Sequence, residues 1–144
     1  MTKRRKRWLG PVILVAAVAQ CAAIATLAGW WYMTAALKTA KSAGVYATPQ
    51  EGMRARIADH YTGVERIEID HAGTNSFDGS NPHVWFVSAR VWAAERGDGK
   101  AIPAGGYDYP GSFFLQVQDG WVHVPEGQFP AVIGVLMRVF HYAG

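Results

Sequence analysis

The sequence has very little cysteine: Cys21 is the only one among 144 residues. It lies inside an apolar run near the N-terminus, so residues 42–144 contain no thiol at all. This larger part of the chain therefore has no disulfide bond to stabilise it and is held together by packing alone. Catalysis or redox chemistry that depends on a thiol is excluded there for the same reason.

Acidic residues are absent from residues 1–41, which contain seven Lys and Arg. All eleven Asp and Glu lie in residues 42–144, together with the other seven basic residues. The net charge of +3 therefore combines a strongly basic N-terminal segment with an acidic remainder of the chain. An acidic domain offers no basic surface for phosphates, so we exclude nucleic acid as a partner.

Motifs of known chemistry are also missing. The sequence contains no nucleophile elbow, no P-loop and no dinucleotide-binding fingerprint. Its five histidines form no H-x-H, H-x-x-x-H or HExxH pair of the kind that binds metal ions. We therefore predict no catalytic residues, no metal and no cofactor, and we favour a non-enzymatic role.

What the sequence does contain is one long apolar run, Leu9–Gly29, within an uncharged stretch from Trp8 to Leu37. A helix over this run is about 31 Å long, which matches the hydrocarbon thickness of a bilayer. The apolar part of a signal peptide is shorter, at about 7–15 residues. The run therefore predicts a transmembrane helix over residues 9–31.

Basic and aromatic residues mark the two ends of this predicted helix. The residues expected at the membrane interfaces are Arg4, Arg5, Lys6, Arg7, Trp8, Trp30, Trp31 and Tyr32. Basic clusters stay in the cytoplasm and aromatic rings prefer the headgroup region. We therefore predict a cytoplasmic tail over 1–8, a single pass through the cell membrane and a C-terminal part outside. The predicted partners are the lipid bilayer and another envelope protein.

Three other uses of the apolar run stay open. Cleavage at the small residues Ala23-Ile24-Ala25 would give a secreted domain after removal of a signal peptide. Lipidation of Cys21 is disfavoured, because Gln20 stands where a small residue is required. A structural or assembly role through helix pairing has only scattered alanines and no G-x-x-x-G motif to support it.

The pattern after the apolar run predicts a tether over 32–47 and one domain over 48–144. Thr48, Pro49 and Glu51 predict the start of a helix over 49–61. Strands are expected over 64–71, 83–95, 112–118 and 121–124, loops over 72–82 and 96–111, and a last helix from Pro130. The predicted fold class is α+β: a two-layer domain in which an antiparallel meander of about four strands has an N-terminal and a C-terminal helix.

The last helix is apolar on nearly all sides, apart from Arg138 and His141. With about 15 residues it is too short to span a bilayer comfortably. We expect it to be buried under the sheet. The alternative is that it lies on the outer membrane surface beside the anchor.

The predicted order of elements looks like that of the cystatin-like and NTF2-like folds. In addition, residues 83–142, including "YPGSFFLQVQDGWVHVPEGQFPAVIGVLMRVF", resemble the C-terminal segment of small bacterial single-pass membrane proteins whose function is not established. The second resemblance implies a bacterial envelope protein. It carries no catalytic residues to this chain.

The candidate binding residues lie in two places. In the predicted loop "GGYDYPG", Tyr107 and Tyr109 flank Asp108 and form either a recognition surface or a lid folded over the core. On the last strand, Trp121 and His123 share a face and are expected to line a pocket with strand 83–95. We therefore favour a binding or accessory module. The alternative is an envelope hydrolase whose aromatic-lined cleft uses His123 with Asp108, which requires the two side chains within about 8 Å.

Overall fold

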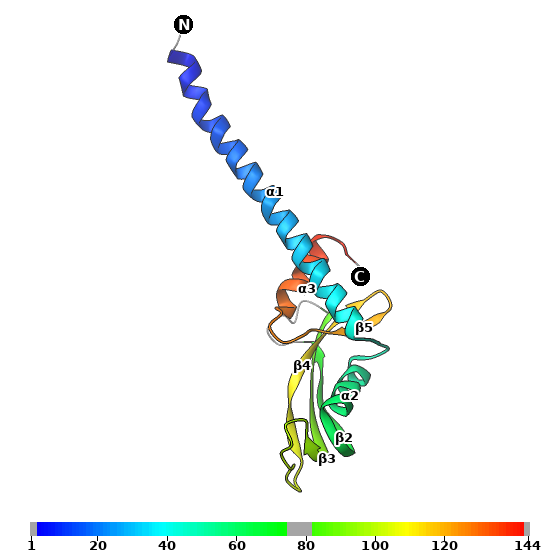
Figure 1. The fold of residues 1–144 in the computed structure, drawn as a ribbon. Coiled ribbons are helices and arrows are strands. Elements are labelled where there is room, and N and C mark those ends of the chain that lie inside the picture. Colours follow the sequence, from blue (N-terminus) through cyan, green and yellow to red (C-terminus); the bar gives the residue numbers. More distant parts are fainter. Residues whose placement is uncertain (1–2, 75–81, 143–144) are drawn as a thin grey trace.

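The computed structural model describes residues 3–74 and 82–142, with side chains from Leu9 onward (Figure 1). Part of the predicted loop over 72–82 therefore falls outside the described residues, as do the side chains of residues 4–8. The elements are α1 (Lys3–Ala43), β1 (Val45–Tyr46), α2 (Pro49–His60), β2 (Tyr61–Thr74), β3 (Val84–Arg96), β4 (Tyr107–Val117), β5 (Gly120–His123) and α3 (Pro130–Val139). The α+β class predicted from the sequence is confirmed.

The longest element is α1, a helix of 41 residues that is about 62 Å long. Its N-terminal two thirds project alone from the domain (Figure 1), and every described side chain from Leu9 to Ala28 is exposed. Among the described residues, Leu9–Ala43 is the one helix long and apolar enough to cross a membrane. The helix therefore fits a membrane anchor, although a signal sequence meets the same criterion.

The C-terminal part of α1 differs from the tether expected over 32–47. The helix continues to Ala43 and buries Met33, Ala36, Leu37 and Ala40 in the domain core. These residues are three or four positions apart and so form one stripe along the helix. Half of the stripe is alanine, and the exposed Lys38 lies between Leu37 and Ala40 in the sequence. For these reasons the sequence pattern did not reveal the stripe.

Four strands form the predicted antiparallel meander, and a fifth is added at its end. The order in the sheet is β1-β5-β4-β3-β2, and every neighbouring pair is antiparallel. The two-residue β1 was not predicted; it pairs Val45 with Val122 and Tyr46 with Trp121. The hairpin between β4 and β5 closes at Gln118 and Asp119, one residue earlier than predicted.

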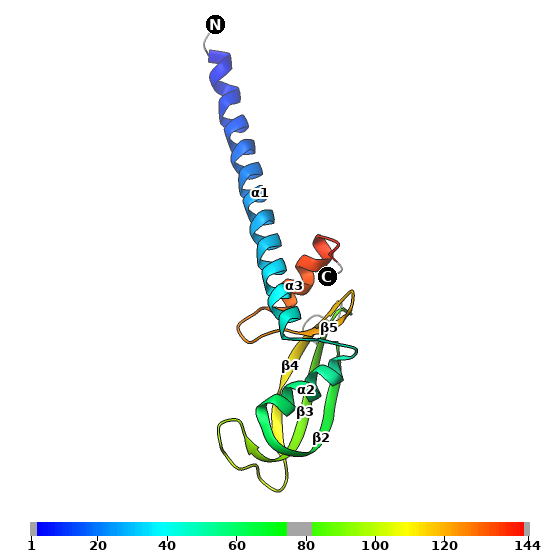
Figure 2. The ribbon, with the colours of Figure 1, turned by 45° about the vertical axis from the view of Figure 1, so that its right-hand side comes forward.

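Helices pack on both faces of this sheet, whereas the sequence predicted a single helical layer. On one face, Leu115 packs with Val84 and Val122 under α1 and α3. On the other face, Phe114 packs with Met53 and Ile57 of α2 (Figure 2). The second helical layer exists because α1 continues past its exposed part and covers the end of the sheet nearest to it.

The α2 helix follows the sequence prediction closely. The side chain of Thr48 accepts a hydrogen bond from the backbone N–H of Glu51 at 3.2 Å, and Pro49 occupies the first turn. The hydrogen bond satisfies one of the orphan N–H groups at the helix start, and Pro49 removes another because proline has no backbone N–H. The buried side chains Met53 and Ile57 are four positions apart and face the sheet.

Strand β4 begins four residues before the end of the loop predicted over 96–111. Tyr107 to Tyr109 pair with β3, and the register shifts where Pro110 and Gly111 follow. The described pairing with β5 covers only Phe114–Val117, so Pro110 lies where its missing N–H breaks no ladder bond. Gly111 lies directly under the ring of Phe86, which leaves no space for a Cβ. Pro and Gly therefore mark a bulge here and not a loop.

The burial of α1 in the core is tested by comparing two leucines on the same helix. Leu37 is 1% exposed, so Leu37→Ala should lower the free energy of unfolding of the domain by about 2–5 kcal/mol. Leu27 is 69% exposed, and Leu27→Ala should change it by less than about 0.5 kcal/mol. Both are measured by chemical denaturation of the full chain in detergent, followed by near-UV circular dichroism. Equal effects of the two substitutions would contradict the described packing.

Candidate functional site

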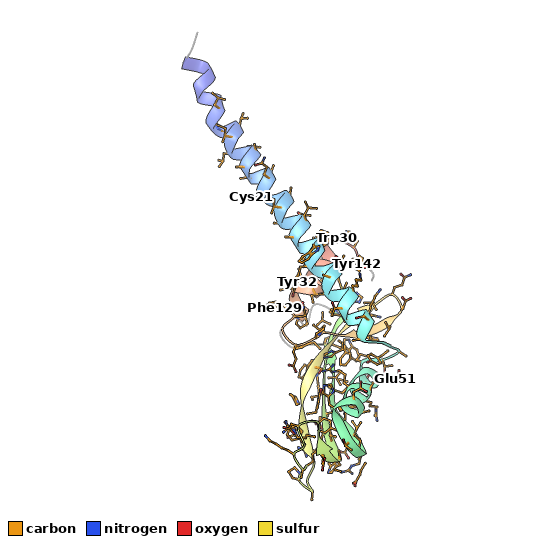
Figure 3. All side chains as sticks on the ribbon, viewed as in Figure 1. Cys21, Trp30, Tyr32, Glu51, Phe129 and Tyr142 are labelled. Carbon is orange, nitrogen blue, oxygen red and sulfur yellow. The ribbon has the colours of Figure 1, made fainter. Side chains whose placement is uncertain are left out.

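The place where α1 enters the domain is built from aromatic contacts with α3 and the residues after it (Figure 3). The ring of Trp30 meets Phe140 at 5.2 Å and Tyr142 at 5.5 Å, both edge to face. One residue earlier, Gly29 leaves room for Leu136, which lies 3.2 Å from the position of a Cβ. Such ring pairs favour a defined geometry, so α3 is fixed against α1 at this height.

A hydrogen bond closes the same junction from the other side. The backbone N–H of Phe129 donates to the hydroxyl oxygen of Tyr32 at 3.2 Å. The two labelled side chains lie next to each other where α3 begins (Figure 3). Because Phe129 precedes the first turn of α3 without a side-chain cap, this contact ties the start of that helix to α1.

Beside this junction lies a cleft of about 980 Å³ between α3 and the adjoining ends of β3 and β4. Its polar lining consists of His83, Gln116, Gln118, Arg138 and His141. Its apolar lining includes Val117, Val135, Met137, Val139 and Tyr142. The volume is in the range that holds small molecules, and the mixed lining is typical of such sites.

The polar lining of the cleft, which comes from the strand ends and from α3 with the residues after it, carries no negative charge among its described residues. Arg138 contributes a positive charge, and His83 shares a hydrogen bond between its Nδ1 and the Gln116 side-chain oxygen at 2.8 Å. The apolar lining is aliphatic and aromatic, and on α3 and the residues after it these side chains stand beside Arg138 and His141. This arrangement suits an amphiphile, a molecule with an apolar chain and a polar head that is neutral or anionic.

Sequence reasoning missed this cleft. Its lining comes from three segments separated in the chain: the start of β3, the end of β4, and α3 with the residues that follow it. None of these segments contains a motif. Only Arg138 and His141, which interrupt the apolar pattern of the last helix, mark the cleft in the sequence.

The predicted trio Tyr107, Asp108 and Tyr109 lies on β4 and away from the cleft. The rings of Tyr107 and Tyr109 lie 6.4 Å and 5.9 Å from that of Tyr61, and Tyr109 packs against the core on the α2 side of the sheet. Burial raises the pKa of Tyr61, and Tyr107 adds to the shift. Asp108 points to the other face of the strand, as its alternation with Tyr107 and Tyr109 requires.

Asp108 forms an exposed ion pair. Its carboxylate accepts a hydrogen bond from Nε of Arg90 at 2.7 Å, and this bond holds the pKa of Asp108 below its ordinary value. The same bond raises the pKa of Arg90. Both groups are therefore charged at neutral pH and neutralise one another on the open face of the sheet.

Trp121 and His123 lie together on the face of the sheet that α2 covers. The ring of Trp121 lies 5.3 Å from that of Trp85 on β3, and His123 lies 5.5 Å from Phe114. His123 is 6% exposed, and burial lowers its pKa to about 4, with smaller effects from Arg56 and His60. His123 is therefore neutral at pH 7 and packs as a core residue.

The pair required for the hydrolase alternative is not assembled. His123 on β5 pairs with Phe114 on β4, and Asp108 lies six residues before Phe114 on β4. Six residues of strand correspond to about 20 Å, far beyond hydrogen-bond reach. In the described ranges, no group of three or more His, Cys, Asp or Glu is close enough to hold a metal ion.

The residues predicted at the second membrane interface have different environments. Trp31 is 73% exposed, whereas Trp30 is 42% exposed and contacts Phe140 and Tyr142 edge to face. Tyr32 is half-buried and bound to Phe129. Two of the three aromatic residues after the apolar run therefore hold α3 in place, and Trp31 remains to face the surroundings.

No protein-family model, curated protein or solved structure matches this chain. Two resemblances therefore stay predictions. One is that of residues 83–142 to bacterial single-pass membrane proteins, and the other is that of the element order to cystatin-like and NTF2-like folds.

The buried state of His123 makes the stability of the domain depend on pH. Its pKa falls from 6.5 in the unfolded chain to about 4 in the fold, so between these values only the unfolded chain binds the proton. The free energy of unfolding should therefore fall as the pH is lowered from 6.5 to about 4, by at most about 1.4 kcal/mol per pH unit. Below that range this residue causes no further loss.

The measurement is denaturant unfolding of the full chain in detergent at several pH values. His123→Gln keeps a polar side chain but cannot take up the proton, and should flatten the profile between pH 6.5 and 4. A variant with the same pH dependence as the wild type would show that His123 is not the group responsible.

Proposed function

We propose that this chain is a single-pass membrane protein whose α+β domain is a binding or accessory module on the outer side of the cell membrane. The observation that carries the proposal is the continuity of α1. One helix has an exposed apolar part from Leu9 to Ala28 and then buries Met33 and Leu37 in the domain core. The domain is therefore held at a fixed height above the anchor.

The dimensions of α1 support the membrane part of the proposal. The exposed residues from Leu9 to Ala28 correspond to about 30 Å of helix, the thickness of the hydrocarbon core. The basic residues before them favour a cytoplasmic N-terminus. With this orientation, the domain and its cleft lie outside the cytoplasm.

The cleft beside α3 is the binding site in this proposal. It is lined by α3, which lies at the end of the domain from which α1 projects (Figure 1), and thus next to the proposed membrane. Its ligand is an amphiphile, which is concentrated at the same surface. Anchoring keeps site and ligand in one thin layer, so a modest affinity is sufficient.

A non-enzymatic role is supported by the separation of the candidate acid and base. His123 is buried among core residues, and Asp108 is neutralised by Arg90 on the opposite face. The cleft is lined by His83 and His141 without a carboxylate among its described lining residues. This set suits recognition of a polar head better than general acid–base catalysis.

Topology and retention of the anchor are tested together. An alkaline phosphatase fused to the C-terminus should be active, because this reporter folds only outside the cytoplasm, and the membrane-bound chain should have the mass of the full sequence. A silent fusion would reverse the orientation. A mass that lacks about 25 N-terminal residues would show cleavage by signal peptidase, and the alternative of a secreted domain would then hold.

The cleft is tested by native mass spectrometry of the full chain released from mild detergent. The wild type should retain an amphiphile. Gln116→Trp, which adds a bulky ring to the cleft wall, should raise the Kd for this amphiphile about tenfold and so lower the retained fraction. This change in Kd corresponds to about 1.4 kcal/mol of binding free energy. The matched control is Glu68→Trp, on the exposed side of β2. Equal retention by both variants would place the bound molecule elsewhere.

A further inference from the structure

We propose that α3 lies in the outer headgroup region of the bilayer, with one apolar stripe in contact with lipid. The stripe consists of Phe129, Val132, Val135 and Val139. This inference rests on the proposed membrane anchor and adds a second membrane contact to it. The domain then touches the bilayer through α3 as well as through α1.

The stripe is separate from the face that α3 uses in the core. Ile133 and Met137 are buried against α1 and the sheet, at 1% and 7% exposed. Phe129 and Val139 are 66% and 64% exposed, and Val132 and Val135 are 47% and 48% exposed. Val132, Val135 and Val139 are three and four residues apart, so they align along one side of the helix.

The height of α3 along α1 places this stripe at the membrane boundary. Leu136 packs over Gly29 and Phe140 packs on Trp30, the first residues after the exposed apolar part of α1. If Leu9 to Ala28 fill the hydrocarbon core, Gly29 and Trp30 lie where the headgroups begin. An element docked on these two residues lies at the same depth (Figure 2).

The size of α3 matches a helix that lies on the surface of a membrane. Its ten residues are about 15 Å long, half the hydrocarbon thickness, so the helix does not span. An interfacial helix buries one apolar side at the boundary between headgroups and acyl chains. Val132, Val135 and Val139 provide that side.

A lipid surface explains the stripe better than a protein partner does. A stable protein interface uses about 20–30 residues on each side, and the stripe offers four. On α1, Leu27 and Trp31, two residues before and after Gly29, are 69% and 73% exposed, so the anchor also presents apolar side chains to its surroundings at this height. The anchor already holds α3 beside the bilayer, so little additional apolar burial is needed.

Contact with lipid would also set how the cleft opens. Val135 and Val139 belong to the stripe and line the cleft as well. The rim of the cleft therefore lies at the lipid surface, and an amphiphile enters it from the bilayer. The polar lining, Arg138 among it, then faces the headgroup layer.

Site-directed spin labelling of the full chain in phosphatidylcholine–phosphatidylglycerol nanodiscs tests this placement. In a Cys21→Ser background, single cysteines are introduced as Ala17→Cys in the span, Val135→Cys on the stripe and Ala58→Cys on α2. All three positions are exposed in the fold, so the substitutions should be tolerated. The depth of each label follows from its relative accessibility to oxygen, which prefers lipid, and to a nickel chelate, which prefers water.

The expected result is an oxygen-accessible label at position 17, an intermediate depth at the headgroup boundary at position 135, and a label accessible to the chelate at position 58. A lipid-exposed label at 17 with a water-exposed label at 135 would overturn the placement of α3 and leave the anchor intact. A label at 135 shielded from both reagents would show that protein covers this position, either the cleft wall or a partner, and would also overturn the placement. A water-exposed label at 17 would refute the anchor itself.

Discussion

The structure depends on one helix, α1, whose two parts have different surroundings. Along its first part, α1 exposes apolar side chains on all sides, which fits a membrane anchor. Along its last turns, it buries a single stripe in the domain core. Because no break separates the two parts, the backbone hydrogen bonds of α1 continue from the proposed membrane into the domain.

This continuity explains why α3 and the cleft lie where they do. The last turns of α1 cover the β5 end of the sheet. Next to them, α3 is held by the edge-to-face contact of Phe140 with Trp30 and by the hydrogen bond from Phe129 to Tyr32. The cleft is the gap that remains between α3 and the ends of β3 and β4. The other end of the sheet is covered only by α2, and its open face carries exposed pairs such as Arg90 with Asp108.

Features encoded by local signals were predictable from the sequence. The Thr48 cap and Pro49 predicted the start of α2, and period-two and β-branched patterns predicted β2 and β3. The apolar run predicted a helix long and apolar enough to cross a membrane. Features that depend on distant contacts were not. The core stripe of α1 consists half of alanines and lies among lysines in the sequence, so it has no clear apolar pattern. Pro110 and Gly111 are typical of a loop but form a bulge here. The cleft is lined by segments that share no motif.

The measurement that tests this account most directly is hydrogen exchange of the full chain in nanodiscs, read over residues 33–43. In an unbroken helix packed on the domain core, the amides of Met33 to Ala40 should exchange as slowly as those of the central strand β3, because opening them requires unfolding of the domain. A flexible tether, or a helix that ends at the membrane surface, would exchange these amides within seconds. That result would contradict the rigid coupling of anchor and domain.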